Sequence, residues 1–416
     1  VDDRWVAFFV GKTLREIQDK QLPVATGRVQ GPALDWIVKR YQERELYLRS
    51  YLTLNLRPTN VKVVLELPKD LGKKECSAAF EGAEATVTRV EDKEEESSPM
   101  PPFTTDELLE SAAFSLKMGV AETMRTAQEL FEAGLITYHR TSSIHVSVTG
   151  MDIARTYIEA KWGEESGELY QPRGWGPEGA HEAIRPTRPM GEEELKNAVE
   201  EGLLRLPFEL RWPHYALYSL IFKRFMQSQM APAKYTKQRF TVSIHPKWEK
   251  GDVSYDGESV TSIIKEGWMK LSNFKLKDSL SQGQALNCEL VSFRKGSQPG
   301  KGILTEGGLV ALMKKKGIGK PSTYASTVER LKKHGYVITR GKLSYLIPTG
   351  WGINLDSVLN KAFPALVSDD TTRRLVEFMD GVENGTYDYQ EVLKKMHDEI
   401  LYACGQAKAV LADNKF

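Results

Sequence analysis

The feature that most constrains the fold of this chain is an internal repeat, whose two copies occupy residues 104–140 and 304–340. Each copy opens with a threonine and a nearby acidic residue, which predicts a helix N-terminus, and continues as an amphipathic pattern. A glycine-containing break separates this helix from a second one, and another glycine ends the second helix before a β-type run. The breaks are at Gly119 and at Gly317 and Gly319, the second helices begin at Glu122 and Ser322, and the terminating glycines are Gly134 and Gly335. Both copies are therefore predicted to form a helix, a turn, a helix and a strand.

The second copy carries an additional pattern that predicts a wing. Its β-type run, residues 336–340, is followed by Gly341-Lys342 and by another run, residues 343–347, which predicts a hairpin with a two-residue turn. The segment from 301 to 342 is also basic, with ten Lys or Arg residues and only two acidic ones. A helix N-terminus and a basic wing both bind phosphates favourably, so this winged helix favours DNA binding. A protein–protein module of the same shape stays an alternative.

Apolar and polar residues alternate, as in half-buried strands, in residues 49–68 and again around 240–244 and 286–290. The stretch between them is mostly helical and includes an aromatic-rich helix over 213–229, with proline in its first turn. These patterns predict a discontinuous β-rich domain with a helical insert. The acidic run 91–96, which ends in Ser-Ser-Pro-Met-Pro-Pro, is interpreted as a solvated linker.

Composition places the chain among ordinary globular proteins. Its 416 residues, 41% hydrophobic and 27% charged, predict about two to four domains. No run approaches the ~18 apolar residues of a spanning helix, and the first residues show no signal pattern, so we expect no membrane partner and a cytoplasmic location. The three cysteines, Cys76, Cys288 and Cys404, lie far apart without Cys-x-x-Cys spacing. They predict a reducing compartment and no structural zinc.

The first copy of the repeat ends in residues that suit phosphoryl chemistry. Tyr138 and Arg140 are two apart in the predicted strand and therefore share a face. A phenol can attack phosphorus and form a covalent ester, while a guanidinium binds the non-bridging oxygens and stabilises charge that develops in the transition state. The pair alone is a weak signal, because Tyr and Arg at this spacing are common as surface neighbours in sheets.

Three other segments contain polar residues of the kind that bind anions. Residues 179–187 combine imidazole, carboxylate, guanidinium and hydroxyl groups, residues 26–30 place Gly, Arg and Gln before a predicted helix over 33–46, and residues 317–324 place glycines, a lysine and two hydroxyls at a helix N-terminus. Each segment also has a structural interpretation: a His–Glu or Glu–Arg pair, a surface arginine, or a simple helix cap.

Taken together, the strings GRVQ, GLITYHRT, AHEAIRPT and GIGKPSTYA, in this order, resemble the type IA DNA topoisomerases. The run TTRRLVEFMDGVENG and the Tyr-His-Arg segment look most like the topoisomerase half of reverse gyrase. The resemblance implies a toroidal, multi-domain mixed α/β core with two winged-helix modules and a β-rich arch. Residues 1–49 and 301–416 would form the base domain with the second winged helix, 50–100 and 205–300 the arch, and 101–204 the winged helix with the catalytic tyrosine.

The resemblance also implies roles for single residues. Tyr138 would be the nucleophile that takes the 5′-phosphate of a cut DNA strand, and Arg140 would contact the scissile phosphate. The remaining carried-over residues are His181, Glu182, Arg185 and Thr187 in the active-site wall, and Thr26, Gly27, Arg28, Val29, Gln30, Lys320, Ser322 and Thr323 on DNA, single-stranded by preference.

The sequence departs from the family in two respects. Ser142 stands where the family commonly has Asp. A Toprim segment with an Asp-x-Asp set, which would bind Mg²⁺, is not recognised, so Mg²⁺ would come from a Toprim segment in the same or another chain. A P-loop is also not recognised, so ATP would act only through a helicase-like half. We therefore expect the chain to bind DNA but to relax no supercoils alone, with a Toprim segment restoring Mg²⁺-dependent cleavage. A non-catalytic winged-helix DNA-binding protein and a tyrosine recombinase stay as alternatives.

Overall fold

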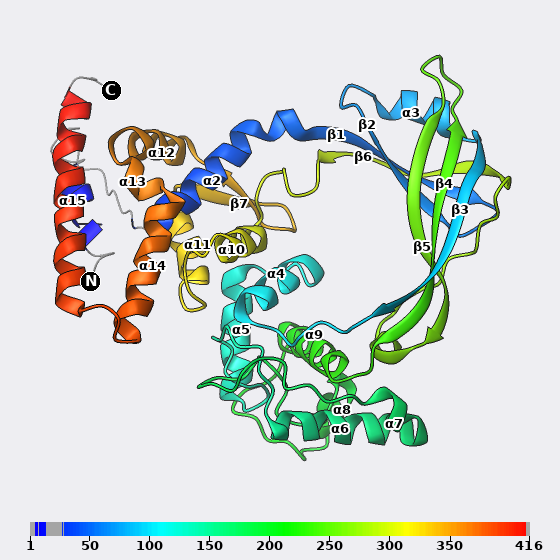
Figure 1. Ribbon diagram of the computed structural model, residues 1–416, viewed down its shortest axis with the longest axis horizontal. Helices are drawn as coiled ribbons and strands as arrows, with labels where there is room; N and C mark the ends of the chain where they lie inside the picture. Colours follow the sequence, from blue (N-terminus) through cyan, green and yellow to red (C-terminus); the bar gives the residue numbers. More distant parts are fainter. Residues whose placement is uncertain (1–4, 7, 14–26, 28, 413–416) are drawn as a thin grey trace.

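A computed structural model describes residues 5, 6, 8–13, 27 and 29–412. Its elements follow a ring (Figure 1). The helices near the two ends of the chain form one side of the ring, long antiparallel strands form the opposite side, and the helices between residues 105 and 228 complete it. The mixed α and β architecture with a β-rich arch is therefore as predicted.

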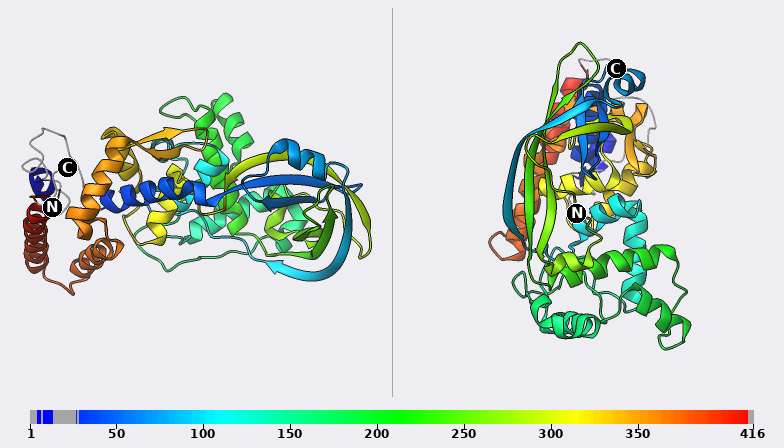
Figure 2. Two further views of the ribbon diagram at one scale, coloured as in Figure 1. Left: turned by 90° about the horizontal axis from the view of Figure 1, so that it is seen from above. Right: turned by 90° about the vertical axis from the view of Figure 1, so that its right-hand side faces the viewer.

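The arch is one antiparallel sheet, which in the described part of the chain has six strands in the order β2-β1-β6-β3-β4-β5. The alternating sequences place every second residue inside, as in β2, where Val63, Leu65 and Leu67 are buried. Helix α3 (Lys73–Phe80) packs Cys76 and Phe80 into the same cluster. Figure 2 shows the long strands curving along the sheet. The strands are β1 Leu48–Arg57, β2 Lys62–Leu67, β3 Glu84–Ser97, β4 Ala233–His245, β5 Val253–Lys265 and β6 Ala285–Ser297.

The acidic run is not a linker, because it forms the second half of β3 and pairs with β4. Lys234 lies opposite Glu96 and bonds Glu94 at 2.6 Å, while Lys237 bonds Glu95 at 3.0 Å. Cations from a strand far along the sequence thus neutralise the run, and cross-strand pairs of opposite charge stabilise a sheet. The linker interpretation was wrong since it considered only local composition.

The first copy of the repeat forms α4 and α5, and its buried face continues into a helical cluster. Leu108, Ala127 and Leu130 of the repeat pack there with Phe222 and Phe225 of α9. The predicted aromatic helix is thus observed, and it begins with Pro213 in its first turn. The helices of this part are α4 Thr105–Ser115, α5 Val120–Glu132, α6 Val148–Trp162, α7 Ser166–Leu169, α8 Glu192–Glu200 and α9 Trp212–Ser228, with short 3₁₀ turns at Gly163–Glu165 and Gly267–Leu271.

The second copy packs with helices from both ends of the described chain, and Leu34, Leu309, Val328 and Leu359 share its buried cluster. This part contains α2 Gln30–Gln42 with a 3₁₀ turn at Glu43–Tyr47, α10 Glu306–Lys315, α11 Tyr324–Lys333, β7 Val337–Arg340, β8 Tyr345–Pro348, α12 Gly350–Ala362, α13 Pro364–Val367, α14 Asp369–Glu383 and α15 Tyr389–Ala412. The division of the chain into three domains stays a proposal, and the packing of α9 favours a boundary after that helix.

Four local predictions differ from the structure. The helix expected over 33–46 covers Gln30–Gln42 instead and is followed by a 3₁₀ turn. The second helices begin at Val120 and Tyr324, two residues from the predicted starts. The wing turn has four residues, because Arg340 pairs with Tyr345 and Ser344 adopts a positive φ of 52°. In the first copy no strand follows Gly134, where a single bridge joins Ile136 to Pro186.

The remaining predictions concern cysteines and membranes. Cys76, Cys288 and Cys404 are buried and free. No helix within the described ranges is long and apolar enough to cross a membrane.

Candidate active site

The loop after α5 and the segment 181–187 lie side by side, which brings two of the predicted motifs together. The Thr137 amide donates to the Arg185 carbonyl oxygen at 2.9 Å, and the Arg185 amide donates to the Thr137 hydroxyl at 3.0 Å. The Thr137 hydroxyl donates to the Ala183 carbonyl oxygen at 2.7 Å. A segment more than forty residues later therefore replaces the missing partner strand and fixes the residue before Tyr138.

Tyr138 is half-buried among three aromatic rings. The ring centroids of Phe131 and His181 lie 5.4 Å from that of Tyr138, and the ring centroid of His139 lies 5.6 Å away. Phe131 meets the tyrosine edge-on, whereas His181 is tilted against it and is itself exposed. Aromatic contacts on both sides limit the positions of the phenol ring.

His139 is the fully buried residue of this loop, with 0% of its surface exposed. Neither ring nitrogen has a hydrogen-bond partner among the described residues. Burial, followed by the neighbouring positive charge of Arg140, lowers the pKa of His139 to about 4, so the ring is neutral at pH 7. The His139 carbonyl oxygen and the Thr141 carbonyl oxygen both lie within 2.9 Å of the Thr105 hydroxyl, which anchors the loop to the start of α4.

Arg140 is exposed and lies beyond the buried His139. The predicted strand is absent here, yet half-buried Tyr138 and exposed Arg140 still flank a buried residue. The phenol and the guanidinium therefore both remain accessible, as the predicted chemistry requires.

The wall residues divide into one accessible residue and three structural ones. Arg185 is buried, with Nε bonded to Glu182 and Nη1 to the Pro186 carbonyl oxygen at 3.0 Å. Burial alone would raise the pKa of Glu182, but hydrogen bonds from Arg185 and Ser147 outweigh it and lower that pKa. The Thr187 hydroxyl donates to the Gly134 carbonyl oxygen at 2.6 Å. Glu182 and Arg185 thus form the ion pair of the structural interpretation, and His181 alone faces Tyr138.

The GRVQ segment lies at the start of α2. Thr26 and Arg28 lie outside the described residues. Gly27 is buried and its carbonyl oxygen accepts from the Gly31 amide at 3.0 Å, while Val29 precedes the helix. Gln30 is the first residue of α2, and its buried Oε1 has no partner among the described residues.

The GIGKPSTYA segment forms the turn before α11. The Thr323 hydroxyl accepts from the Lys320 amide at 2.8 Å, and Lys320 Nζ is 2.8 Å from Asp380. Ser322 is exposed. Tyr324 is core, and burial raises its pKa to about 12. This segment packs near α2, so the structure forms two groups of motifs, one beside Tyr138 and one in the second copy.

The basic block contains both paired and unpaired cations. Four of its lysines bond carboxylates: Lys314 with Asp106, Lys316 with Asp369, Lys320 with Asp380 and Lys332 with Glu306. The other six cations of the block have no carboxylate partner among the described residues, namely Lys301, Lys315, Arg330, Lys333, Arg340 and Lys342. Except for Lys301, the unpaired charges gather at α10, the end of α11 and the wing.

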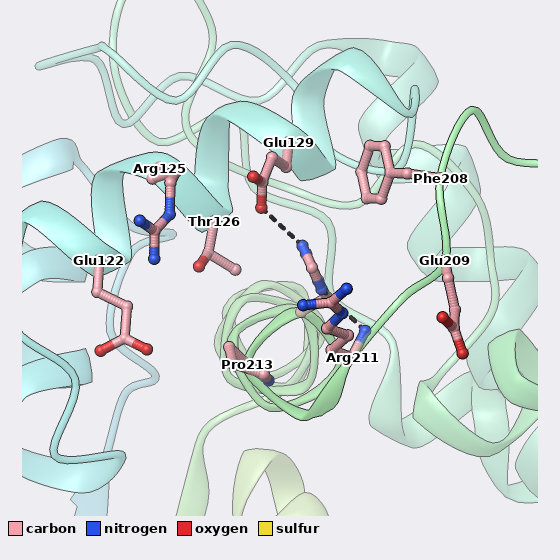
Figure 3. A pocket seen from close by; sticks show the side chains of 9 residues that line it. Glu122, Arg125, Thr126, Glu129, Phe208, Glu209, Arg211 and Pro213 are labelled. Carbon is pink, nitrogen blue, oxygen red and sulfur yellow. Dashed lines mark hydrogen bonds and ion pairs between the residues drawn. The ribbon is translucent and has the colours of Figure 1, made fainter.

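A pocket of about 570 Å³ lies between α5 and the start of α9 (Figure 3). His214 Nε2 and a Glu129 carboxylate oxygen are 2.8 Å apart, and His214 Nδ1 accepts from the Arg211 amide at 2.9 Å. Since Nδ1 accepts, Nε2 carries the proton donated to Glu129. Arg125 and Glu209 also line the pocket, so its lining carries charges of both signs. The contact between Glu129 and His214 connects α5 to α9.

The described residues contain no group of three or more His, Cys, Asp or Glu side chains placed to hold a metal ion. Glu182, the carboxylate of the motif beside Tyr138, is already paired with Arg185. The described residues around Tyr138 therefore do not fit a Mg²⁺ site of their own.

A model of the family described as DNA topoisomerase matches residues 2–394 of this chain. The chain belongs to the type IA DNA topoisomerases. Reverse gyrase of Pyrococcus furiosus is 40% identical over 403 residues, which are 96% of this chain and 31% of that protein. Reverse gyrase 1 of Aquifex aeolicus is 37% identical over 407 residues, 96% of this chain and 33% of that protein. Topoisomerase I from Thermotoga maritima has a similar structure, with a TM-score of 0.73 and 27% identity, over 100% of this chain and 68% of that one.

These matches confirm the family inferred from the four motifs, whereas the roles of single residues stay predictions. The chain spans about a third of the length of the curated relatives it matches. Residues of this candidate site that the sequence did not predict include Phe131, His139 and Thr137, the hydroxyl residue directly before Tyr138. A signal for Thr137 was available, since a hydroxyl beside a predicted nucleophile often bonds the backbone.

Proposed function

We propose that this chain is the DNA-cleaving and strand-passing part of a type IA topoisomerase of the reverse gyrase kind. The observation that supports the proposal most is the geometry of Tyr138, which is accessible and ordered by Phe131 and His181, with the exposed Arg140 close behind. A plain DNA-binding winged helix has no need of an ordered, accessible phenol in the loop after its second helix.

In the proposed reaction Tyr138 Oη forms a bond to a backbone phosphorus while the bond from that phosphorus to the 3′ oxygen breaks. The phenolic proton passes to solvent and the departing 3′ oxygen takes up a proton, which leaves a 5′-phosphotyrosine and a free 3′-hydroxyl. Arg140 binds the non-bridging oxygens, where negative charge develops. The ester retains the energy of the phosphodiester, so resealing after strand passage is the reverse step and requires no ATP.

The proposed DNA contacts follow from exposure and charge. His181 lies at the surface beside Tyr138, whereas Glu182, Arg185 and Thr187 would act by holding the loop. Ser322, Thr323 and Lys320 would meet the strand in the second copy, and Lys320 would exchange Asp380 for a phosphate. We propose that the bound DNA is single-stranded, since cleavage of one strand requires it unpaired at the tyrosine.

The proposed partners follow from the family resemblance and from the greater length of the relatives, of which this chain covers about a third. A Toprim segment would supply the ligands for Mg²⁺, since the described residues contain no cluster suited to it, and a helicase-like ATPase segment would couple the reaction to positive supercoiling. Either segment could belong to the same chain or to another.

The test is a covalent adduct assay with single-stranded oligonucleotides labelled at one end, with and without an added Toprim segment and Mg²⁺. The proposal expects an adduct only with the Toprim segment and Mg²⁺, and only from DNA labelled at its 3′ end. The 5′-labelled fragment should run free, and Tyr138→Phe should form no adduct.

Two results would favour the other functions. An adduct on the 5′-labelled fragment means a 3′-phosphotyrosine and indicates recombinase chemistry. Tight duplex binding with no adduct under any condition indicates a non-catalytic winged-helix protein.

A further inference from the structure

The two copies of the repeat meet in one joint, where α4 of the first copy packs against α10 of the second. A Cβ atom on Gly307 would lie 2.8 Å from the Ala113 Cβ and 3.3 Å from the Glu110 Cα, so the two helix backbones approach closely only because residue 307 is glycine. Leu109 and Val120 of the first copy belong to the same buried cluster as the core of the second. The joint is therefore apolar and closely packed.

Glu306, the first residue of α10, crosses this joint with its side chain. It is only 2% exposed, and its Oε2 accepts a buried hydrogen bond of 2.8 Å from the amide of Val120, the first residue of α5. Its Oε1 accepts from Lys332 Nζ at 2.6 Å. A carboxylate at a helix N-terminus is stabilised by the unpaired amides and by the helix dipole. A side chain at residue 119 would place a Cβ 3.1 Å from Oε2, so Gly119 leaves room for this contact.

A second ion pair crosses the joint, from Asp106 of α4 to Lys314 of α10, and it is weaker. Asp106 of α4 is 3.4 Å from Lys314 Nζ of α10, and it also accepts from the Thr104 hydroxyl at 3.1 Å. Lys314 is 47% exposed, so solvent screens this pair more than the pair of Glu306 with Lys332, which is 33% exposed. Glu306 therefore provides the dominant polar contact across the joint.

The path of the chain makes this joint a place where the ring can part. The first copy is connected to the sheet through β3 before α4 and through β4 after α9. The second copy follows β6, and α2, which packs with it, leads into β1. Every covalent connection between the copies within the described chain thus passes through the arch (Figure 1). The α4–α10 joint is closed by non-covalent contacts alone.

We propose that Glu306 is the positioning residue that keeps the ring closed, and that its hydrogen bond to the start of α5 sets how often the two copies separate. This inference rests on the proposed function, in which separation admits the strand to be passed. According to this proposal, the carboxylate of Glu306 controls the ratio of open to closed rings.

The experiment measures opening directly and does not depend on catalysis. Dyes are attached at Glu159→Cys on α6 and Glu329→Cys on α11, two exposed positions on opposite sides of the joint, while the native cysteines are buried. Single-molecule energy transfer then reports the ratio of open to closed molecules of the full chain. Glu306→Ala should raise this ratio about tenfold to a hundredfold, the range for a lost charge-assisted hydrogen bond in a buried site. Glu306→Gln, which retains an acceptor for the Val120 amide, should raise it less.

The matched control is Glu192→Gln, which removes an ion pair of the same 2.6 Å length with Lys196 but lies within α8. It should leave the ratio unchanged. Adduct formation on a short oligonucleotide, which requires no strand passage, should stay within about twofold in Glu306→Gln. Equal energy transfer in wild type and folded Glu306→Gln and Glu306→Ala would overturn the proposal. If Glu306→Ala does not fold, Glu306→Gln decides alone. Failure of the adduct assay in wild type would overturn the proposed function without affecting this measurement.

Discussion

The two copies of the repeat share a pair of helices and differ in the segment after the second helix. In the second copy the chain continues into β7, whose partner β8 is the next segment, so the hairpin is complete within the copy. In the first copy the loop from Gly134 to Thr141 takes its hydrogen bonds from residues 183–187 and from Thr105 instead. The same pair of helices is therefore followed by a basic wing in one copy and by the tyrosine loop in the other. The difference lies in the partner of the segment after the second helix, which is β8 in the second copy and residues 183–187 in the first.

The charges of the two copies differ in the same way. The second copy presents Arg340 and Lys342 on its wing, both without a carboxylate partner in the described part of the chain. The first copy places neutral His139 inside and Arg140 outside, beside Tyr138. In the proposed function one copy would hold DNA by charge and the other would react with it, and substitutions in each copy test that separation.

The largest effect is expected for Tyr138→Phe, which removes one oxygen and no charge. Adduct yield should fall by at least about a thousandfold, since the proposed nucleophile is lost, while DNA affinity stays within about twofold. The measurement is adduct yield together with fluorescence anisotropy. The control is Thr339→Val, which removes a hydroxyl from the wing and should leave the adduct intact. Undiminished adduct in Tyr138→Phe would show that another residue is the nucleophile.

The next effect separates the two arginines that end the copies. Arg140→Ala should slow cleavage by a transition-state contribution of roughly 2–4 kcal/mol, about 30- to 900-fold, with a much smaller loss of affinity. Arg340→Ala should instead weaken binding and reduce the slope of log affinity against log salt by about 1, because one phosphate contact is lost. Single-turnover cleavage and salt titrations measure the two quantities. Equal losses of cleavage and binding in Arg140→Ala would make it a binding residue only.

The sequence predicted those parts of each copy that depend on neighbours along the chain. The threonine caps, the two helices, the terminating glycines and the wing all follow from local patterns, and so does the order of the motifs. The failures involve distant partners: the acidic run pairs with β4, and the loop at Tyr138 pairs with residues 183–187. Local charge or alternation cannot reveal a partner that lies many residues away.

The site was predicted in composition but only partly in geometry. Tyr138, Arg140 and His181 are accessible in the structure, whereas Glu182 and Arg185 neutralise each other. A carboxylate and a guanidinium three residues apart are equally compatible with an ion pair and with two separate ligands. The structure shows the ion pair because Arg185 is buried against Gly150. A Cβ atom added at Gly150 would lie 2.8 Å from Arg185 Nε, so the guanidinium occupies the space that this glycine leaves.

A third effect concerns His139, which the second copy replaces with exposed wing residues. Its pKa is lowered to about 4 in the folded chain, so between pH 6.5 and 4 the unfolded chain binds more protons. Its contribution to stability is therefore complete above about pH 6.5 and is lost as the pH falls toward 4. Wild type should lose roughly 1–2 kcal/mol more than His139→Met between pH 6.5 and 5. Thermal unfolding at several pH values measures this, and parallel pH profiles would contradict it.

The smallest effects are expected at the caps that start both copies. The Thr305 hydroxyl accepts from the Gly308 amide at 3.0 Å, so Thr305→Ala should cost about 1 kcal/mol, or about 1–2 °C in the unfolding midpoint of a chain this long. Thr104→Ala should cost at least as much, because it also removes a partner of the buried Asp106 at 3.1 Å. Serine at either position should restore the midpoint, since it retains the oxygen. A smaller shift in Thr104→Ala than in Thr305→Ala would show that the hydrogen bond from Thr104 to Asp106 adds nothing to the stability of the first copy.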